Sequence, residues 1–195
     1  MSKMEEKQYS ILVVSGSEHF DALVRRILTR GRFLKPGIHR NAASARRRLL
    51  EYEYDVVVIN SPLPDEFGHE LAMDAARKWG ASVLIVVPAE VYENVLENLT
   101  DMGIMALAKP VPPERLSQAI RYLAAVRGRI HELQQQVRKT AEKMDELRIV
   151  SKAKVLLVEK KHMTEDEAHR LIGRRAMDDG LTRKRVAQQI LDELE

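Results

Sequence analysis

Three short runs of aliphatic and β-branched residues lie in the first half of the chain, at residues 11–14, 55–59 and 83–87. Apolar runs of this length are typical of parallel strands that are buried on both faces of a sheet. Two weaker strands are predicted at 33–38 and 104–107, and helix-length segments lie between the strands at 18–30, 41–51, 68–78 and 91–101. Because parallel neighbours need a crossover helix, this alternation predicts an α/β fold with a five-stranded, doubly wound parallel sheet.

A heptad pattern follows after Pro112 and Pro113, which are tolerated in the first turn of a helix. Apolar residues recur at alternate spacings of four and three from 119 to 147, which predicts a coiled coil. Branched residues at one seam position, Ile130 and Val137, with Leu at the other favour two parallel strands. A single amphipathic helix that lies on its own domain is the alternative. The expected dimerisation residues are Leu123, Val126, Ile130, Leu133, Val137, Met144 and Leu147.

The end of the chain predicts a small three-helix unit, with helices at about 149–161, 164–179 and 182–194. Thr164 and Glu167 have the spacing of a capping box, Gly180 is suited to end the second helix, and Thr182 can cap the third. The expected domains are therefore 1–113, a coiled-coil helix at 114–148, and 149–195. The whole chain is then α/β with a helical extension, or α+β overall.

Composition narrows the possible functions. The 195 residues include no Cys, which excludes disulfide scaffolds, thiolate zinc sites and Cys nucleophiles. The six His residues do not have metal-ligand spacing, and no Gly-rich phosphate loop occurs, so we expect no metal, no cofactor and no enzymatic activity. The start of the chain has no apolar signal segment, and the apolar runs are too short to span a membrane. We therefore expect a cytoplasmic protein.

Several residues at the predicted strand ends form a recognisable pattern. Asn60, Pro64 and Gly68 follow the third strand, and Lys109-Pro110 follows the fifth. With five strands and five helices, this segment resembles the receiver domain of two-component response regulators. The resemblance implies a site at the carboxyl ends of the strands, where ligands of such sheets bind.

The resemblance also shows where this chain departs from the family. Receiver domains have two acidic residues for Mg²⁺ after the first strand, an Asp that accepts the phosphoryl group after the third, and a hydroxyl residue after the fourth. Here Ser15 and Gly16 replace the acidic pair, Asn60 replaces the acceptor and Pro88 replaces the hydroxyl, so that only Lys109 remains. An amide is not a carboxylate nucleophile, and Mg²⁺ prefers carboxylate oxygens. These changes predict a pseudo-receiver with a degenerate phosphorylation site.

The last segment has a second set of motif residues. They are Ala153-Lys154 and Leu156-Leu157, residues 163–168, Leu171, Arg174 and Ala176-Met177, and Val186-Ala187 with Ile190. This segment resembles the ANTAR domain of AmiR- and NasR-type transcription antitermination regulators, although Val155 stands where that family often has Gly. A pseudo-receiver, a coiled coil and this unit follow in the family's order. The resemblance implies a homodimer that binds paired hairpins in a leader mRNA and prevents terminator formation.

Candidate RNA contacts follow from a helical wheel. Arg170 and Arg174 are four residues apart on the polar side of the second helix with Met177 beside them, an arrangement that suits contact with a base or a ribose. Arg175 falls on the apolar side and is expected to pair within the unit. Solvated surface side chains are the alternative for this face.

Further candidate contacts come from the other two helices of the unit. Arg183 and Arg185 lie in the first turn of the third helix, where cations oppose the helix dipole but favour phosphate binding. Lys154 adds a cation on the first helix, and all of these cations are expected to be exposed. From residue 149 onward ten basic residues face nine acidic ones, so the charge of the unit alone does not indicate RNA.

Two other functions remain open at this point. One is a protein-interaction adaptor, in which the pseudo-receiver docks a sensor protein and the helical unit docks another protein. The other is a DNA-binding response regulator, which is disfavoured because Asp178 and Asp179 would lie beside any recognition helix. The activating signal can be a sensor protein or a ligand bound at the pseudo-receiver.

Overall fold

The structure is a computed structural model of the chain that describes residues 8–29 and 32–194. It divides into two compact units, of which the first ends at His131 and the second begins at Glu132. Among the described residues, no helix is both long enough and apolar enough to cross a membrane.

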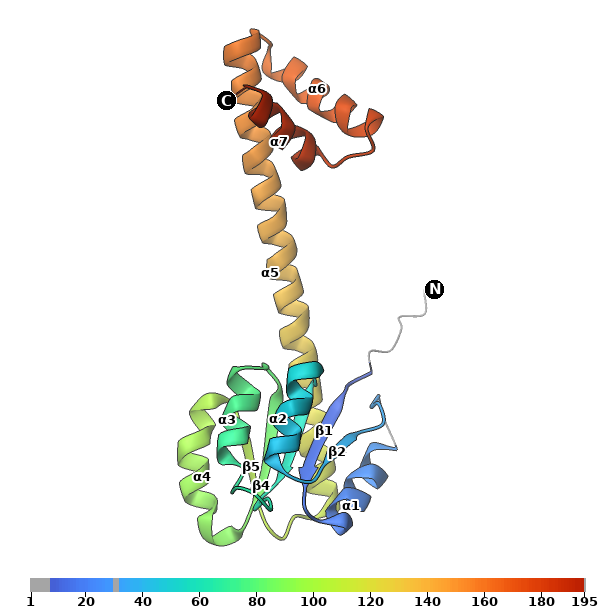
Figure 1. Ribbon diagram of the computed structural model, residues 1–195, viewed down its shortest axis with the longest axis vertical. Helices are drawn as coiled ribbons and strands as arrows, with labels where there is room; N and C mark the ends of the chain where they lie inside the picture. Colours follow the sequence, from blue (N-terminus) through green and yellow to red (C-terminus); the bar gives the residue numbers. More distant parts are fainter. Residues whose placement is uncertain (1–7, 30–31, 195) are drawn as a thin grey trace. The chain divides into compact units, whose positions relative to one another are not determined.

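The first unit is built on one parallel sheet of five strands in the order β2-β1-β3-β4-β5 (Figure 1). The strands are β1 (Ile11–Ser15), β2 (Gly37–His39), β3 (Val56–Asn60), β4 (Ser82–Val87) and β5 (Met105–Ala108). The connecting helices are α1 (Glu18–Leu28), α2 (Ala42–Glu51), α3 (His69–Arg77) and α4 (Tyr92–Leu99), with one-turn 3₁₀ helices η1 (Ala89–Val91) and η2 (Thr100–Met102). The predicted doubly wound α/β fold is confirmed.

Helices cover both faces of this sheet. Leu12 and Val14 of β1 point toward the layer formed by α2, α3 and α4, while Ile11 and Val13 point toward α1 and the start of α5 (Pro113–Lys161). These four strand residues are almost fully buried. Burial on both sides explains why the strands are continuous apolar runs rather than alternating ones.

Strand β2 is shorter than predicted and begins later. It spans only Gly37–His39, at the edge of the sheet, and pairs with β1 alone. Phe33, which was expected to start the strand, makes an isolated bridge to Tyr9 instead. Pro36 lies between them and has no N–H to donate to a ladder, which accounts for the interruption.

Helix α5 is a single helix of 49 residues, so the predicted helix at 149–161 is its final part. The first turns of α5 belong to the core of the first unit, where Leu116, Ile120 and Leu123 are buried against the sheet. Leu123 was expected in the coiled-coil seam, and that prediction is wrong. A helix that packs on a sheet has apolar residues at intervals of three and four, and so does a helix that packs on a partner helix. The spacing therefore does not distinguish the two kinds of packing.

The second unit consists of the later part of α5, α6 (Glu165–Asp178) and α7 (Arg183–Leu194). Its core is small and aliphatic, and it contains Ala153, Leu157, Ala168, Ile172, Ala176, Val186, Ala187, Ile190 and Leu191. The predicted capping box is confirmed, since Thr164 and Glu167 exchange hydrogen bonds at the start of α6. Gly180 takes a φ of +63° after that helix, a left-handed conformation that suits glycine.

Candidate functional site

The carboxyl ends of the strands form a cleft of about 640 Å³ in the first unit. Asn60, Pro88 and Lys109 line it, together with apolar side chains that include Phe20 and Leu116. At its base the Asn60 amide nitrogen donates a hydrogen bond to the Ser15 hydroxyl over 3.1 Å. The structure therefore brings together the end positions of β1, β3, β4 and β5 that correspond to the receiver site.

The side chains in this cleft do not have the chemistry of a phosphoryl acceptor. Asn60 is 6% exposed, and its Oδ1 has no hydrogen-bond partner in the described part of the chain. The Lys109 ammonium donates to the Ser61 carbonyl oxygen over 2.5 Å, and burial lowers the pKa of Lys109. Lys109 thus acts as a structural donor that holds the loop after β3.

Arg40 is a cation near the carboxyl ends of the strands that was not predicted from the sequence. Its Nη1 lies 2.5 Å from the buried Asp21 carboxylate and donates to the Ser15 carbonyl oxygen over 3.4 Å. Gly16 next to it has little room, because a Cβ there would lie 3.2 Å from Pro64 Cγ. A cation and a crowded glycine therefore stand at the end of β1, where receiver domains carry their acidic pair. Arg40 directly follows β2, so its nearness to the strand ends could have been inferred from the parallel sheet.

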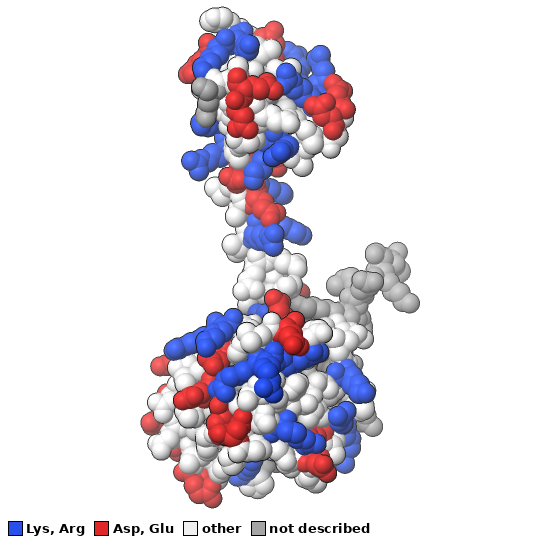
Figure 2. All heavy atoms as spheres, viewed as in Figure 1, with Lys and Arg blue, Asp and Glu red and all other residues white. Residues whose placement is uncertain are grey.

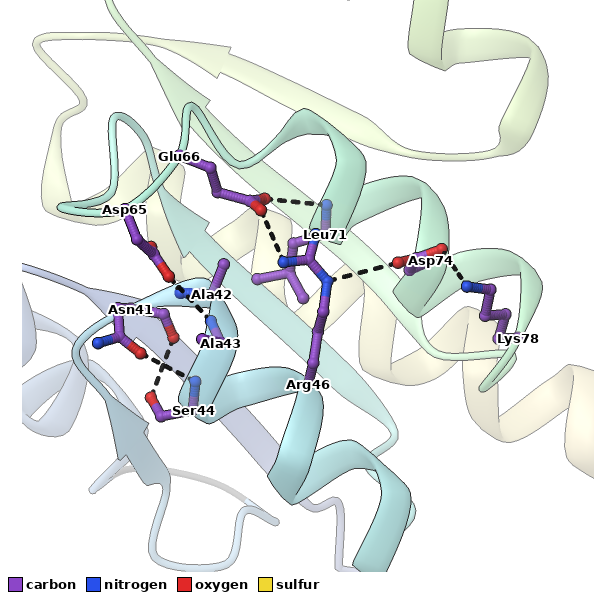
Figure 3. A network of polar contacts seen from close by, with 10 residues as sticks. All are labelled: Asn41, Ala42, Ala43, Ser44, Arg46, Asp65, Glu66, Leu71, Asp74 and Lys78. Carbon is purple, nitrogen blue, oxygen red and sulfur yellow. Dashed lines mark hydrogen bonds and ion pairs between the residues drawn. The ribbon is translucent and has the colours of Figure 1, made fainter.

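The loop after β3 is tied to two helices by a polar network (Figure 3). The Asp65 carboxylate accepts hydrogen bonds from the Ala42 and Ala43 N–H groups, both over 2.9 Å, and so caps α2 from another part of the chain. Burial alone would raise the pKa of Asp65, but these backbone donors outweigh it and leave the pKa below its ordinary value. The loop is therefore fixed to the start of α2.

The same network continues to α3 through Arg46. Its guanidinium lies 2.6 Å from the Glu66 carboxylate and 3.4 Å from that of Asp74, as Figure 3 shows. Glu66 also accepts from the Leu71 N–H over 3.3 Å. A partly buried arginine thus joins α2, the loop and α3.

In the second unit, α6 carries the exposed face that the helical wheel predicts. Arg170, Arg174 and Met177 are all exposed, and Met177 is 78% exposed. Neither arginine forms an ion pair with another described residue. Arg175 instead lies 3.5 Å from Glu193 of α7, which confirms the internal pairing expected from its place on the wheel.

The first turn of α7 carries three cations, of which one is ion-paired and two are not paired with a described carboxylate. Lys184 lies 2.5 Å from the Asp145 carboxylate of α5, which raises the pKa of Lys184. Arg183 and Arg185 are exposed, and no described carboxylate pairs with them. The Thr182 hydroxyl accepts from the Arg185 N–H over 3.2 Å and caps the helix as predicted. Two of the three side chains are therefore available to an anionic ligand.

Lys154 is less exposed than its candidate role assumes. Its side chain is 21% exposed and lies 2.6 Å from the Glu165 carboxylate, whose pKa it lowers by hydrogen bonding and charge. The expectation of an exposed side chain is wrong here, because the first turn of α6 folds back onto this part of α5. Lys154 nevertheless lines one hollow of about 410 Å³ with Arg183 and His169.

The middle of α5 has an apolar stripe that the other described residues leave exposed. Leu133, Val137, Met144 and Leu147 are between 47% and 69% exposed, and Ile130, one turn earlier, is 40% exposed. Val126 is half-buried in the first unit. Of the seven predicted seam residues, five thus remain on an exposed stripe, whereas Leu123 belongs to the sheet core.

Comparison with known proteins identifies the second unit and then the chain. The model of the ANTAR domain matches residues 138–191, from the middle of α5 to α7. The transcriptional regulatory protein PdtaR of Mycobacterium tuberculosis is 33% identical over 141 residues, which cover 72% of this chain and 68% of that protein. The chain belongs to the family of ANTAR regulators. Protein PetR of Rhodobacter capsulatus is also similar, at 29% identity over 54% of this chain and 44% of that protein.

Solved receiver domains match the first unit of this ANTAR regulator in fold. The receiver domain of an HD domain-containing protein from Pseudomonas fluorescens Pf-5 has a TM-score of 0.58 at 19% identity and covers 67% of this chain and 97% of its own. A CheY-like receiver protein of Methanospirillum hungatei JF-1 has a TM-score of 0.54 at 19% identity over 63% and 98%. The receiver-like fold of the first unit is confirmed.

Proposed function

We propose that this ANTAR regulator is an RNA-binding transcription antiterminator. As a homodimer it binds paired hairpins in a leader mRNA and prevents formation of a terminator. The observation that carries the proposal is the face of α6, where Arg170, Arg174 and the exposed Met177 lie together on the unit that matches the ANTAR domain.

This face has the chemistry to bind an unpaired RNA base. Proteins read RNA loops by stacking splayed bases on flat or apolar side chains and by hydrogen-bonding their edges. Met177 offers the apolar surface. The guanidinium groups of Arg170 and Arg174, which lie about one helix turn apart, offer planar hydrogen-bond donors. Because neither arginine is held by a described carboxylate, binding would not have to break an ion pair.

The start of α7 supplies the phosphate contacts in this proposal. Arg183 and Arg185 stand at a helix N-terminus, where backbone N–H groups and the helix dipole favour an anion. Lys154 and Arg183 line a common hollow, so a phosphate there would compete with Glu165 for Lys154. Lys154 is thus expected to contribute less than the two arginines.

Two copies are needed for two hairpins. The exposed stripe at Ile130, Leu133, Val137, Met144 and Leu147 supports a coiled coil between two copies of α5, because apolar residues at heptad spacing bury one another in such a pair. Each copy then presents one ANTAR unit, and the dimer engages both hairpins with the avidity of two linked sites.

The receiver-like domain acts in this proposal as a docking or ligand-binding part that is not phosphorylated. Asn60 lacks a nucleophilic carboxylate, and Ser15 and Gly16 at the end of β1 supply no carboxylate oxygen for Mg²⁺. The cleft beside Asn60 and Lys109 is available to a sensor protein or a ligand.

A titration of the full chain tests the proposal. We expect binding to a paired-hairpin RNA and much weaker binding to duplex DNA and to an RNA with scrambled loops. Arg174→Gln should lose discrimination between cognate and scrambled loops. Its matched control is Arg175→Gln, the adjacent residue that is paired with Glu193 and should leave binding unchanged. Preference for duplex DNA, or binding to no nucleic acid, would favour the DNA-binding or the adaptor function instead.

A further inference from the structure

The charge of the first unit is divided between two regions of its sequence. Residues 18–48 contain nine Lys and Arg against two Asp and Glu, whereas residues 51–101 contain two basic residues against eleven acidic ones. The net charge of the whole chain, +3, conceals this division. In the face drawn in Figure 2, basic side chains gather over α2 and toward β2, and acidic ones are more frequent toward α4. The basic region follows the edge of the sheet that β2 forms.

Some of these cations are paired within the fold and others are not. Arg40, Arg46 and Arg48 form ion pairs with nearby carboxylates. Four other cations of this region are exposed and form no ion pair with a described residue, and they are Arg25 and Arg26 in the last turn of α1, Lys35 before β2, and Arg47 on α2. Arg25, Arg26 and Lys35 are thus exposed cations near the chain that leads into β2, and no described carboxylate pairs with them.

Two arginines of α2 act on the edge strand. Burial, followed by the charges of Arg48 and Arg47, lowers the pKa of His39 in β2. The positive charge of α2 therefore reaches the edge strand.

A hollow of about 340 Å³ lies at this edge, between the end of α1 and the chain that leads into β2. Its lining is apolar at Leu28, Phe33 and Leu34, and Leu34 is 46% exposed. Arg25 and Lys35 also line it. An aromatic and aliphatic surface with cations beside it is what proteins use to bind unpaired nucleotides, since bases stack on it while phosphates meet the charges.

We propose that the β2 edge of the receiver-like domain is a second RNA contact, which binds an unpaired stretch of the transcript that flanks the hairpins. The inference rests on the proposed RNA-binding function and extends it to a surface outside the ANTAR domain. Arg25, Arg26 and Lys35 bind phosphates, and the hollow at Phe33 and Leu34 receives a base.

The acidic region of a second copy is the other occupant that charge complementarity allows. Such a contact joins two different surfaces, and a contact of that kind adds copies without closing unless its rotation happens to form a ring. Charge complementarity with a second copy also does not explain the apolar hollow beside Arg25 and Lys35. The hollow therefore favours RNA.

The test compares two RNAs with the full-length protein. One carries the paired hairpins alone, and the other adds about ten unpaired uridines at each end, a length within the site size of single-strand binders. The edge variant is Arg25→Gln/Arg26→Gln/Lys35→Gln. The control variant, Arg77→Gln/Lys78→Gln/Arg115→Gln, removes the same charge from exposed cations elsewhere on the unit.

We expect the wild type and the control to bind the extended RNA more tightly than the hairpins alone, and the edge variant to bind both equally. Loss of three phosphate contacts should lower the salt slope by about two units for single-stranded RNA, on the order of fifty-fold in affinity at moderate salt. Equal losses in the edge and control variants would overturn the proposal, as would hairpin binding with no effect of the extensions. Salt-sensitive assembly beyond the dimer without RNA, lost only in the edge variant, would assign the edge to a second copy instead.

The outcome also separates this inference from the proposed function. Binding of a free uridine oligonucleotide that the edge variant loses, with no binding of paired hairpins, would contradict the antiterminator and still support the edge site. Hairpin binding whose affinity does not change when the unpaired extensions are added would support the antiterminator and contradict the edge site.

Discussion

Replacing Val137 and Met144 by Asp should separate the proposed dimer without unfolding its subunits. The two side chains are 69% and 67% exposed and take no part in the core of either unit. In a coiled coil they occupy the same seam position one heptad apart, where each inserts between residues of the partner helix. The substitutions therefore act on the dimer and spare the single chain.

The expected size of the effect follows from burial. Two copies with two substitutions each lose four buried apolar side chains, at about 1.5 kcal/mol or more for each. Four carboxylates must also leave water, which adds a further penalty of at least about 1 kcal/mol for each one that finds no partner. A total above about 6 kcal/mol corresponds to a loss of more than about ten-thousand-fold in dimer affinity.

Light scattering and analytical ultracentrifugation measure this effect, with circular dichroism to check the fold. The double Asp variant should be monomeric at micromolar concentration and retain native helicity. Lys139→Asp, on an exposed position outside the stripe, should remain dimeric, as should the conservative pair Val137→Leu/Met144→Leu. A double Asp variant that stays dimeric would refute the reasoning and place the contact on another surface. A wild-type chain that is monomeric would refute it as well.

Three further predictions concern the site residues. Incubation with acetyl phosphate and Mg²⁺ should add no phosphoryl group by intact mass, and Asn60→Asp alone should not restore acceptance because the acids that bind Mg²⁺ are still missing; a stoichiometric acyl phosphate on the wild type would contradict this. Asp65→Ala should reduce the free energy of unfolding in urea by about 1 kcal/mol at neutral pH, through loss of the α2 cap. Because the folded pKa of Asp65 is lowered, its contribution is present above about pH 4 and is lost as the pH falls through the folded pKa, so the difference between variant and wild type should shrink in acid; an unchanged difference would be inconsistent with the cap. Arg183→Gln should lower the salt slope of RNA binding by about one unit, whereas Lys184→Gln, already paired with Asp145, should change it less; equal slopes would contradict the proposed contact.

The strands of the sheet and its doubly wound class could be predicted from the sequence, because each buried strand has a local apolar pattern. β3 and β4 are continuous apolar runs, and the helix between them, α3, begins directly after Gly68. β2 was placed less well, since an edge strand has weak burial and Pro36 divides it from Phe33. The ends of a strand depend on which backbone N–H and C=O groups find hydrogen-bond partners. Composition does not show these partners.

The start of the coiled-coil stripe could not be located from spacing. Leu116, Ile120 and Leu123 face the sheet, while Val137 and Met144 lie exposed on the same helix. Leu116, Ile120 and Leu123 are spaced by four and three residues, and Val137 and Met144 by seven, which is the sum of the two. The pattern therefore indicates that the helix has one apolar side but not what covers it. Only the packed sheet distinguishes the two.

The candidate RNA contacts show a similar division. The wheel correctly placed Arg170 and Arg174 on an exposed face and Arg175 on a face that pairs with α7. The partners of Lys154 and Lys184 are carboxylates on other helices, at Glu165 and Asp145. Such pairs depend on how the helices pack, and they could not be read from one helix alone.

Ultraviolet crosslinking in the source cells tests the central claim most directly. The protein would be purified with its crosslinked nucleic acid, the RNA sequenced, and the crosslinked peptides mapped by mass spectrometry. We predict enrichment of leader transcripts with two adjacent hairpins that overlap a terminator, and crosslinks in α6 and α7 near Arg174 and Arg183. Crosslinks to DNA alone, or RNA without paired hairpins, would contradict the antiterminator function of this ANTAR regulator.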